Sequence, residues 1–138
     1  MKKMIMVSGG FDPPHIGHVR MFKEAAKWGD VVVAINSDDW LMRKKGYVFM
    51  PWEQRAEIIR EFESVSLTIS FDDSDNTACA AIAKIRPAAF ANGGDRKKDN
   101  TPEMDMCDKL GIQMLWGIGG KDKPQSSSWL VNKFLENK

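Results

Sequence analysis

The sequence predicts an α/β fold: one Rossmann-like domain over residues 1–138, with a five-stranded parallel sheet and helices on both faces. Two observations predict it. Short apolar runs alternate along the whole chain with segments whose apolar residues recur at helical spacing, as in parallel sheets with crossover helices. The chain length of 138 residues also fits a single domain, and no internal repeat, linker or low-complexity segment divides it.

The N-terminal third of the chain predicts one β-α-β unit. Residues 4–8 form a short apolar run that ends at two glycines, which favours a buried strand. Residues 17–28 carry apolar side chains on one stripe, as expected for a helix, and a Gly-Asp pair ends it. Residues 31–35 are apolar throughout, as in a central strand of a parallel sheet.

The rest of the chain continues the alternation. A polar, basic stretch over residues 36–47 is expected to connect the second strand to a helix over 51–63, since Pro51 suits a first helical position. The later elements, in order, are a strand over 65–71, a turn over 72–76, a helix over 77–85, a strand over 88–91, a helix over 102–110, a strand over 112–116 and a helix over 126–136. The loops after the first, fourth and fifth strands should then gather at one edge of the sheet.

Composition excludes several classes of protein. The net charge of +1 argues against nucleic-acid binding, which usually requires a strongly basic face. No segment approaches the roughly 20 apolar residues of a membrane span, and the first residues are too weakly apolar for a signal peptide. Cys79 and Cys107 have neither metal-ligand nor disulfide-framework spacing, so we expect reduced thiols in a cytoplasmic protein.

The segment with the clearest chemistry is GGFDPPHIGH at residues 9–18, which follows a strand and opens a helix. Glycines permit close backbone approach to a phosphate, and a helix N-terminus offers N–H groups and a positive dipole end. His15 and His18, the only two histidines, are three residues apart and share a helix face, and Gly17 between them leaves room for a nucleotide. Such a pair suits stabilisation of charge on a transferring phosphoryl group. The alternatives are a structural pair in a solvated turn, or zinc binding, for which a third ligand is lacking nearby.

This segment resembles the HxGH motif of the nucleotidyltransferase α/β-phosphodiesterase superfamily, and the resemblance covers nearly the whole chain. Phe11 to His18 looks most like the nicotinate mononucleotide adenylyltransferases. The remainder is more similar to the compact cytidylyltransferases, such as those for glycerol 3-phosphate, and to the heptose-phosphate adenylyltransferases. The matching segments are Asn36-Ser37-Asp38-Asp39, Lys44-Lys45-Gly46, Pro51-Trp52-Glu53-Gln54-Arg55 and Gly93-Gly94-Asp95.

The resemblance implies that a substrate phosphate attacks the α-phosphorus of a nucleoside triphosphate in line, without a covalent enzyme intermediate. Positioning and charge neutralisation would supply the catalysis. His15 and His18 would hold the α- and β-phosphates, Lys44 or Lys45 would reach the phosphates, and Arg55 would support the active site. Without the resemblance, the lysines could form a solvated basic loop, and Arg55 could be an ordinary surface arginine.

Further residues are assigned to nucleotide binding. The loop after the fourth strand would cup the sugar and base of the nucleotide, and the serines that open the last helix could both cap it and bind phosphate. Superfamily members carry an arginine beyond these serines, which this chain lacks, so a lysine upstream is expected to replace it. The nucleotide-binding candidates are Gly9, Gly10, Phe11, Asp12, Gly17, Gly93, Gly94, Asp95, Lys121, Lys123, Ser126, Ser127 and Ser128. Asp12 is also a candidate for orienting a triphosphate bound to Mg²⁺, the expected cofactor.

These observations favour transfer of CMP from CTP to a polyol or sugar phosphate, with release of pyrophosphate. The alternatives are an adenylyltransferase that uses ATP, of the heptose-phosphate, nicotinate mononucleotide or phosphopantetheine type, and a nucleotide-binding regulatory protein without turnover. Class I aminoacyl-tRNA synthetases also carry a His-Ile-Gly-His motif, but the small size and neutral charge of this chain argue against that class. The resemblance further implies a homodimer, for which residues 40–52 are the candidate surface.

Overall fold

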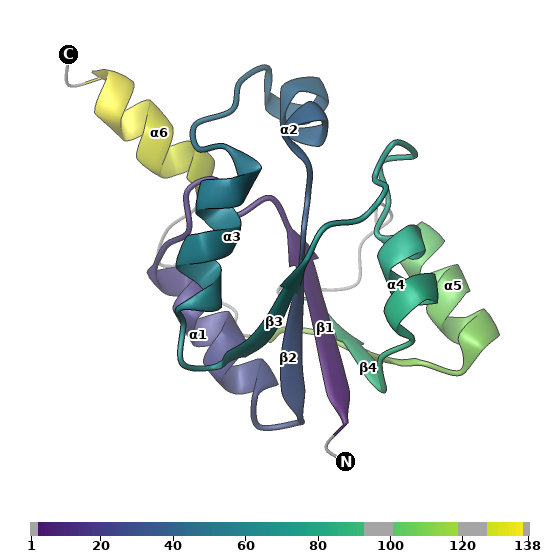
Figure 1. Cartoon of the computed structure of the whole chain (residues 1–138). Helices are drawn as coiled ribbons and strands as arrows, with labels where there is room; N and C mark the ends of the chain where they lie inside the picture. Colours follow the sequence, from purple (N-terminus) through teal and green to yellow (C-terminus); the bar gives the residue numbers. More distant parts are fainter. Residues whose placement is uncertain (1–2, 93–100, 119–126, 137–138) are drawn as a thin grey trace.

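The five predicted strands form one parallel sheet. In a computed structural model, which describes residues 3–92, 101–118 and 127–136, the sheet order is β3-β2-β1-β4-β5 (Figure 1). The strands are β1 (Met4–Gly9), β2 (Asp30–Ile35), β3 (Val65–Ile69), β4 (Ala89–Ala91) and β5 (Gln113–Leu115). Every pairing between neighbours is parallel. The predicted α/β class and strand number are confirmed.

Helices cover both faces of this sheet. They are α1 (Ile16–Ala25), α2 (Asp38–Lys45), α3 (Trp52–Arg60), α4 (Cys79–Ile85), α5 (Thr101–Leu110) and α6 (Ser127–Glu136). Figure 1 shows α1 and α3 on one side of the strands and α4 and α5 on the other. Ile5 and Val7 pack with the first pair of helices, whereas Met6 between them packs with the second pair. Alternate residues of β1 therefore supply two cores, as the period of a strand requires.

The chain changes direction across the sheet between β1 and β4. From β1 it proceeds to β2 and β3 on one side, and it then returns to add β4 and β5 on the other. In open α/β sheets, ligands bind beyond the carboxyl ends of the strands at such a switch point. The loop that follows β1, residues 10–15, begins at this point, so the fold places the GGFDPPHIGH segment where a ligand site is expected.

The polar stretch after β2 differs from the prediction, because most of it is the helix α2. Ser37 caps the helix by accepting a hydrogen bond from the Trp40 N–H, and Gly46 ends it in the left-handed conformation. Acidic residues occupy the first turn and basic residues the last, which favours a helix through its dipole. Leu41 is the buried residue of α2. Hydrophobic periodicity therefore missed a helix that is specified by its caps and charges.

Candidate active site

The two histidines lie together at the first turn of α1. The ring centroids of His15 and His18 are 3.8 Å apart and their planes are inclined by 28°, so the rings are stacked. His15 is the N-cap residue, and its Nδ1 accepts a hydrogen bond of 3.0 Å from the Gly17 N–H. The Nδ1 of His18 accepts one of 3.1 Å from the His15 N–H. The predicted shared face is confirmed, and the pair also forms a capping box of the kind usually made by Ser or Thr with Glu.

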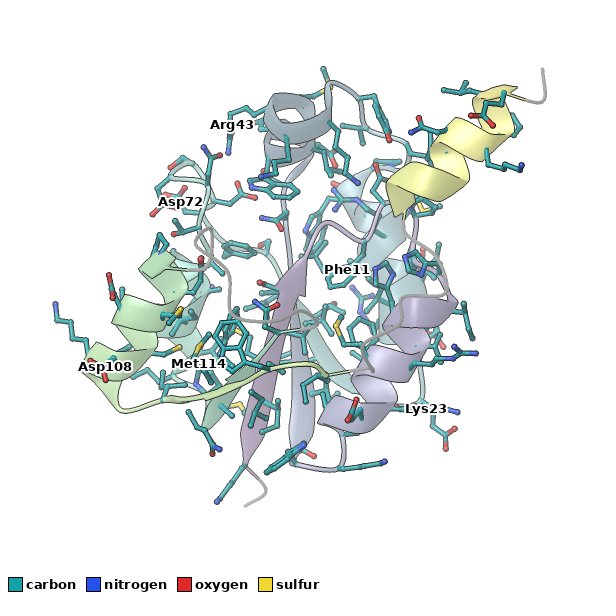
Figure 2. The ribbon with its side chains drawn as sticks, turned by 180° about the vertical axis from the view of Figure 1, so that it is seen from behind. Phe11, Lys23, Arg43, Asp72, Asp108 and Met114 are labelled. Carbon is teal, nitrogen blue, oxygen red and sulfur yellow. The ribbon has the colours of Figure 1, made fainter. Side chains whose placement is uncertain are left out.

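Phe11 supports this pair from the protein side. Its ring meets the His18 ring edge-on, with centroids 4.8 Å apart, and it also contacts Phe22 of α1. Figure 2 shows Phe11 between the end of β1 and α1. The residue is 5% exposed and adopts a positive φ of 52°. A Cβ on Gly9 would come within 2.9 Å of the Phe11 ring. Phe11 is therefore a packing residue behind the histidines, and Gly9 gives it space.

The expectation that the start of α1 offers its backbone N–H groups to a phosphate needs correction. The Gly17 N–H is used by His15, and the N–H groups of His18 and Val19 both reach the His15 carbonyl. These N–H groups are therefore already used within the protein. An anion would meet imidazole groups that are themselves hydrogen-bonded to the helix end.

The two candidate lysines are separated by their positions on α2. Lys44 is exposed, whereas Lys45 is half-buried and lies close enough to Asp12 and Arg55 to interact with their charges. Burial lowers the pKa of Lys45; the carboxylate of Asp12 opposes this effect, and the guanidinium of Arg55 adds to it. Asp12 belongs to the loop after β1, so Lys45 lies near that loop. Arg43 is used elsewhere, since it binds the Asp73 carbonyl and the Asn76 side chain.

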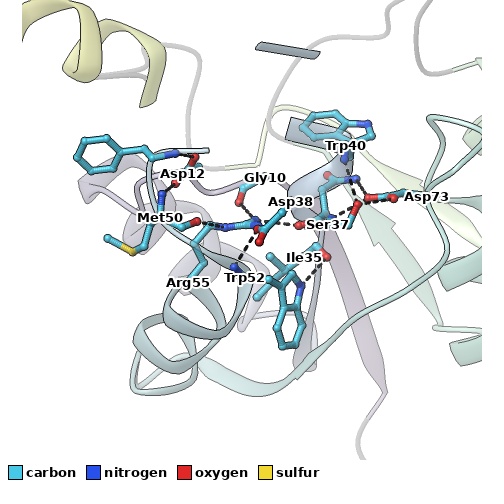
Figure 3. Close-up of polar contacts among 12 residues, drawn as sticks. Gly10, Asp12, Ile35, Ser37, Asp38, Trp40, Met50, Trp52, Arg55 and Asp73 are labelled. Carbon is cyan, nitrogen blue, oxygen red and sulfur yellow. Dashed lines mark hydrogen bonds and ion pairs between the residues drawn. The ribbon is translucent and has the colours of Figure 1, made fainter. Parts of the chain in front are cut away.

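Arg55 is the central connection between the loops around the site. Its guanidinium is fully buried and donates to the carbonyl oxygens of Met50, Gly10 and Asn36 at 2.7–2.8 Å (Figure 3). It also donates to the Asp38 carboxylate at 2.6 Å. The loops after β1 and β2 and the segment before α3 are thus tied to one side chain. This geometry fits the predicted role of Arg55 in supporting the active site. The side chain would act by holding the surrounding loops in place.

Asp12 also connects the loop after β1 to the segment before α3. It is fully buried, and its two carboxylate oxygens accept the N–H groups of Phe49 and Met50 at 2.7 and 2.6 Å. The sequence predicts that Asp12 orients a magnesium-bound triphosphate, but both of its carboxylate oxygens are used by the backbone of the segment before α3. This geometry favours a positioning role, in which Asp12 fixes the loop after β1 against that segment.

A third buried contact joins the ends of β2 and β3. Asp73 is 4% exposed and accepts hydrogen bonds from the Asn36 side chain and from both the N–H and the hydroxyl of Ser37. These bonds hold the start of α2 against the turn after β3. Trp52 adds a bond from its indole N–H to the Ile35 carbonyl (Figure 3). Sequence inspection missed Asp73; the signal available was an acidic residue in the turn that follows a strand.

A pocket of about 200 Å³ opens beside this contact. It lies beyond the carboxyl ends of β2 and β3, and its lining combines hydroxyls and carboxylates with aromatic side chains. The lining residues are Ile35, Ser37, Asp38, Asp39, Trp52, Ser70 and Phe71. Because the Asp38 carboxylate and the Gly10 carbonyl share Arg55, the pocket is tied to the loop that carries the histidines.

Several predicted nucleotide-binding residues cannot be placed. Gly93, Gly94, Asp95, Lys121, Lys123 and Ser126 lie outside the described residues. Ser127 and Ser128 are described in backbone only, where they begin α6. Within the described ranges, no group of three or more His, Cys, Asp or Glu side chains is arranged to hold a metal ion. Over the same ranges, no helix combines the length and apolar character needed to cross a membrane.

The class of protein follows from comparison with known families. The chain matches the cytidylyltransferase-like family over residues 6–118, and it belongs to that family. This extent covers the sheet, the histidine segment and the Arg55 contacts described above. The chain is therefore a member of the nucleotidyltransferase superfamily, as its histidine motif indicated.

The chain is also similar to individual members of known protein families. The bifunctional protein HldE of Citrobacter koseri is 35% identical over 123 residues, which are 87% of this chain and 24% of HldE. HldE of Salmonella paratyphi B gives the same values. This chain thus spans about a quarter of the length of these relatives.

Solved structures support the same assignment. A lipopolysaccharide core biosynthesis protein from Thermoplasma volcanium is 26% identical, with a TM-score of 0.69 over 84% of this chain and 94% of that one. A putative nicotinate-nucleotide adenylyltransferase from Vibrio parahaemolyticus has a TM-score of 0.60 at 16% identity, covering 100% of this chain and 90% of that one, and shows the shared fold.

Proposed function

We propose that this protein transfers AMP from ATP to a sugar phosphate and releases pyrophosphate. The observation that carries the proposal is the stacked pair of His15 and His18 at the switch point, with Lys45 on the adjacent helix. The choice of ATP rests on the 35% identity to HldE, which agrees with the sequence resemblance to heptose-phosphate adenylyltransferases. Transfer of CMP from CTP to a polyol or sugar phosphate is the second candidate, since the family is described as cytidylyltransferase-like.

The reaction requires little of the protein beyond positioning. An oxygen of the acceptor phosphate forms a bond to the α-phosphorus of the triphosphate, and the bond from that phosphorus to the β-phosphate oxygen breaks. Pyrophosphate leaves with the electron pair, and no proton has to be transferred. His15 and His18 would donate hydrogen bonds to the oxygens that gain charge in the transition state, and Lys45 would neutralise part of that charge.

The pocket beyond β2 and β3 is the proposed place of the sugar. Ser70 offers a hydroxyl, and Asp38 and Asp39 offer carboxylate oxygens that accept hydrogen bonds from sugar hydroxyls. The indole of Trp52 provides an apolar wall. This combination of a few polar groups with apolar walls is typical of small-molecule pockets.

Mg²⁺ would be introduced with the triphosphate. Mg²⁺ is often held by one or two carboxylates together with substrate phosphates and water. Asp12 already uses both oxygens for backbone N–H groups. We therefore propose that the ion is held chiefly by phosphate oxygens, where it would neutralise the charge of the leaving pyrophosphate.

The test is pyrophosphate release by the purified protein with Mg²⁺ and either ATP or CTP, against a panel of sugar phosphates, polyol phosphates, nicotinate mononucleotide and phosphopantetheine. We expect turnover with ATP and a sugar phosphate. Turnover with CTP but not with ATP would instead favour the second candidate, cytidylyl transfer. Tight nucleotide binding without pyrophosphate release from any pair would instead support a regulatory protein. Isothermal titration with each triphosphate supplies the binding measurement, and the His18→Gln variant is the catalytic control.

A further inference from the structure

Several polar groups that line the pocket beyond β2 and β3 are already used by the fold. The hydroxyl of Ser37 donates to a buried carboxylate and accepts a backbone N–H. The indole N–H of Trp52 donates to a carbonyl of β2, and Oδ1 of Asp38 accepts from Arg55 and from the Trp52 backbone N–H (Figure 3). These groups hold the pocket in shape, so an occupant has to be recognised by others.

The polar groups that remain available are carboxylate oxygens and one hydroxyl. Among the described residues, no hydrogen bond or ion pair is made by the Asp39 carboxylate, by Oδ2 of Asp38 or by the hydroxyl of Ser70. No lysine, arginine or histidine is among the lining residues. The pocket therefore offers its occupant hydrogen-bond acceptors and no positive side chain.

The charge of Asp39 is the one that stays uncompensated at this pocket. Asp38 forms an ion pair of 2.6 Å with the buried Arg55, whereas Asp39 has no cationic partner in the described part of the chain. Asp39 also lies in the first turn of α2, where its carboxylate offsets the positive end of the helix dipole. The aromatic rings of Trp52 and Phe71 complete the lining, and their π faces attract cations and disfavour anions. The pocket is consequently negative in potential.

The size of the pocket indicates which part of an acceptor it can hold. Its volume of about 200 Å³ is below the roughly 300–1,000 Å³ that is usual for a complete small-molecule ligand. A phosphate group would meet carboxylates there and no cation, so it is expected to lie outside. The part that enters is therefore the end of the acceptor that carries no phosphate.

We propose that this pocket selects acceptors by charge and that Asp39 is the residue that makes the selection. An end that carries hydroxyl or ammonium groups is accepted, because these groups donate to the available carboxylate oxygens. An end that carries a carboxylate is rejected. The inference rests on the proposed function and narrows its substrate class to the phosphates of neutral and amino sugars. The same charge disfavours the phosphates of uronic acids and nicotinate mononucleotide.

Three sugar phosphates that differ only at C6 test the selection: glucose 1-phosphate, 6-amino-6-deoxyglucose 1-phosphate and glucuronate 1-phosphate. Their binding is followed with and without a non-hydrolysable ATP analogue, through the ¹⁵N–¹H resonance of the Trp52 indole, which lines the pocket and is assigned with Trp52→Phe. We expect the amino sugar to bind at least as tightly as the neutral sugar. The uronate should bind about 10-fold more weakly, because the Asp39 charge acts at short range but is partly screened by solvent.

Matched variants assign the effect to Asp39. Asp39→Asn keeps the size and the oxygen of the side chain but removes the charge, and it should reduce the preference for the neutral sugar over the uronate to about twofold. The control is Asp108→Asn, an exposed position on α5, which covers the opposite face of the sheet from α3 (Figures 1 and 2). It removes the same charge and should leave the preference unchanged. Raising the ionic strength from about 0.01 M to about 1 M should weaken the preference in the wild type and not in Asp39→Asn.

Equal affinities for the three sugars, or a preference that Asp39→Asn leaves intact, would overturn the proposal. A Trp52 resonance that none of them shifts would do the same. Tighter binding of the uronate would show instead that the backbone at the start of α2 binds anions. The titration needs no turnover, so a protein that ranks the sugars as expected but releases no pyrophosphate would retain the charge selection and lose the proposed activity.

Discussion

The two histidines are fixed by hydrogen bonds that span two and three residues of sequence, whereas one bond of Arg55 spans 45. Both groups contact the loop after β1. The histidine pair is partly exposed and made within one helical turn, while Arg55 is fully buried and joins three separate segments. The groups proposed to meet the ligand are thus held by local contacts, and the group that fixes the loops around them is buried and makes long-range contacts. Substitutions in the two regions should consequently have different effects on activity and on stability.

The largest effect on stability is expected at the buried residue Arg55. Arg55→Met would remove the donor to three backbone carbonyls and the ion pair with Asp38, which would keep its hydrogen bond from the Trp52 N–H. We expect a loss of about 3–5 kcal/mol in the free energy of unfolding, because unpaired buried polar groups are costly. Urea unfolding measures it. Arg43→Met is the matched control: its side chain is 41% exposed, and we expect a loss below about 1 kcal/mol. Equal losses in the two variants would remove the distinction between the regions.

A smaller effect is expected where the two regions meet, at Lys45. Lys45→Met should lower kcat/KM by about 10- to 100-fold, the value of one charge-assisted hydrogen bond to phosphate. Lys44→Met should change it by no more than roughly twofold, since its exposed charge is screened by salt. Steady-state pyrophosphate release distinguishes them. If Lys44→Met caused the larger loss, the assignment of Lys45 to the site would be wrong.

The pH dependence at Lys45 has a definite sign. Because burial lowers its pKa, activity that needs the ammonium should fall as pH rises through that lowered pKa. The Lys45→Arg variant stays charged, so its activity should not fall in the same range. The stability of the fold should change with pH in the opposite direction to the activity. Burying the charged Lys45 costs folding free energy at neutral pH, and this cost is relieved as pH rises toward 10.5. Lys45→Met should therefore not destabilise the protein, which urea unfolding at two pH values can check.

The smallest effect is expected at the two glycines that end β1 and open the loop after it. A Cβ on Gly9 would meet the Phe11 ring at 2.9 Å, and a Cβ on Gly10 would meet Leu41 of α2 at 3.0 Å. Each alanine substitution should cost about 1 kcal/mol of stability through overpacking. Gly9→Ala should also reduce kcat severalfold, because Phe11 backs His18, and Gly10→Ala should not. Similar kcat values for both variants would show that the packing behind the histidines is adjustable.

Two expectations from sequence remain predictions. A homodimer would place residues 40–52 at the subunit contact, and sedimentation velocity can determine the oligomeric state. The cytoplasmic location is predicted from composition, and fractionation of the cells that produce the protein can test it.

Periodicity and local motifs determined much of this protein. The alternation of strands and helices predicted the sheet, and the spacing of His15 and His18 predicted a shared face, because both depend on residues a few positions apart. Even α2, which periodicity missed, was specified locally by Ser37, Gly46 and the charges between them. A sequence pattern can carry such information because a helical turn or a cap is formed within four or five residues.

Only the tertiary structure decided the partners of the buried polar groups. The sequence suggests that Asp12 orients a metal-bound triphosphate, whereas in the structure its oxygens accept the N–H groups of Phe49 and Met50, which are 37 and 38 residues away. The only sequence signal at Asp73 is an acidic residue in the turn that follows a strand, yet Asp73 holds the start of α2 through Ser37. A buried polar side chain must find a partner, but its type and spacing do not specify which backbone group the fold will bring within hydrogen-bond distance. That choice depends on how the loops meet at the edge of the sheet.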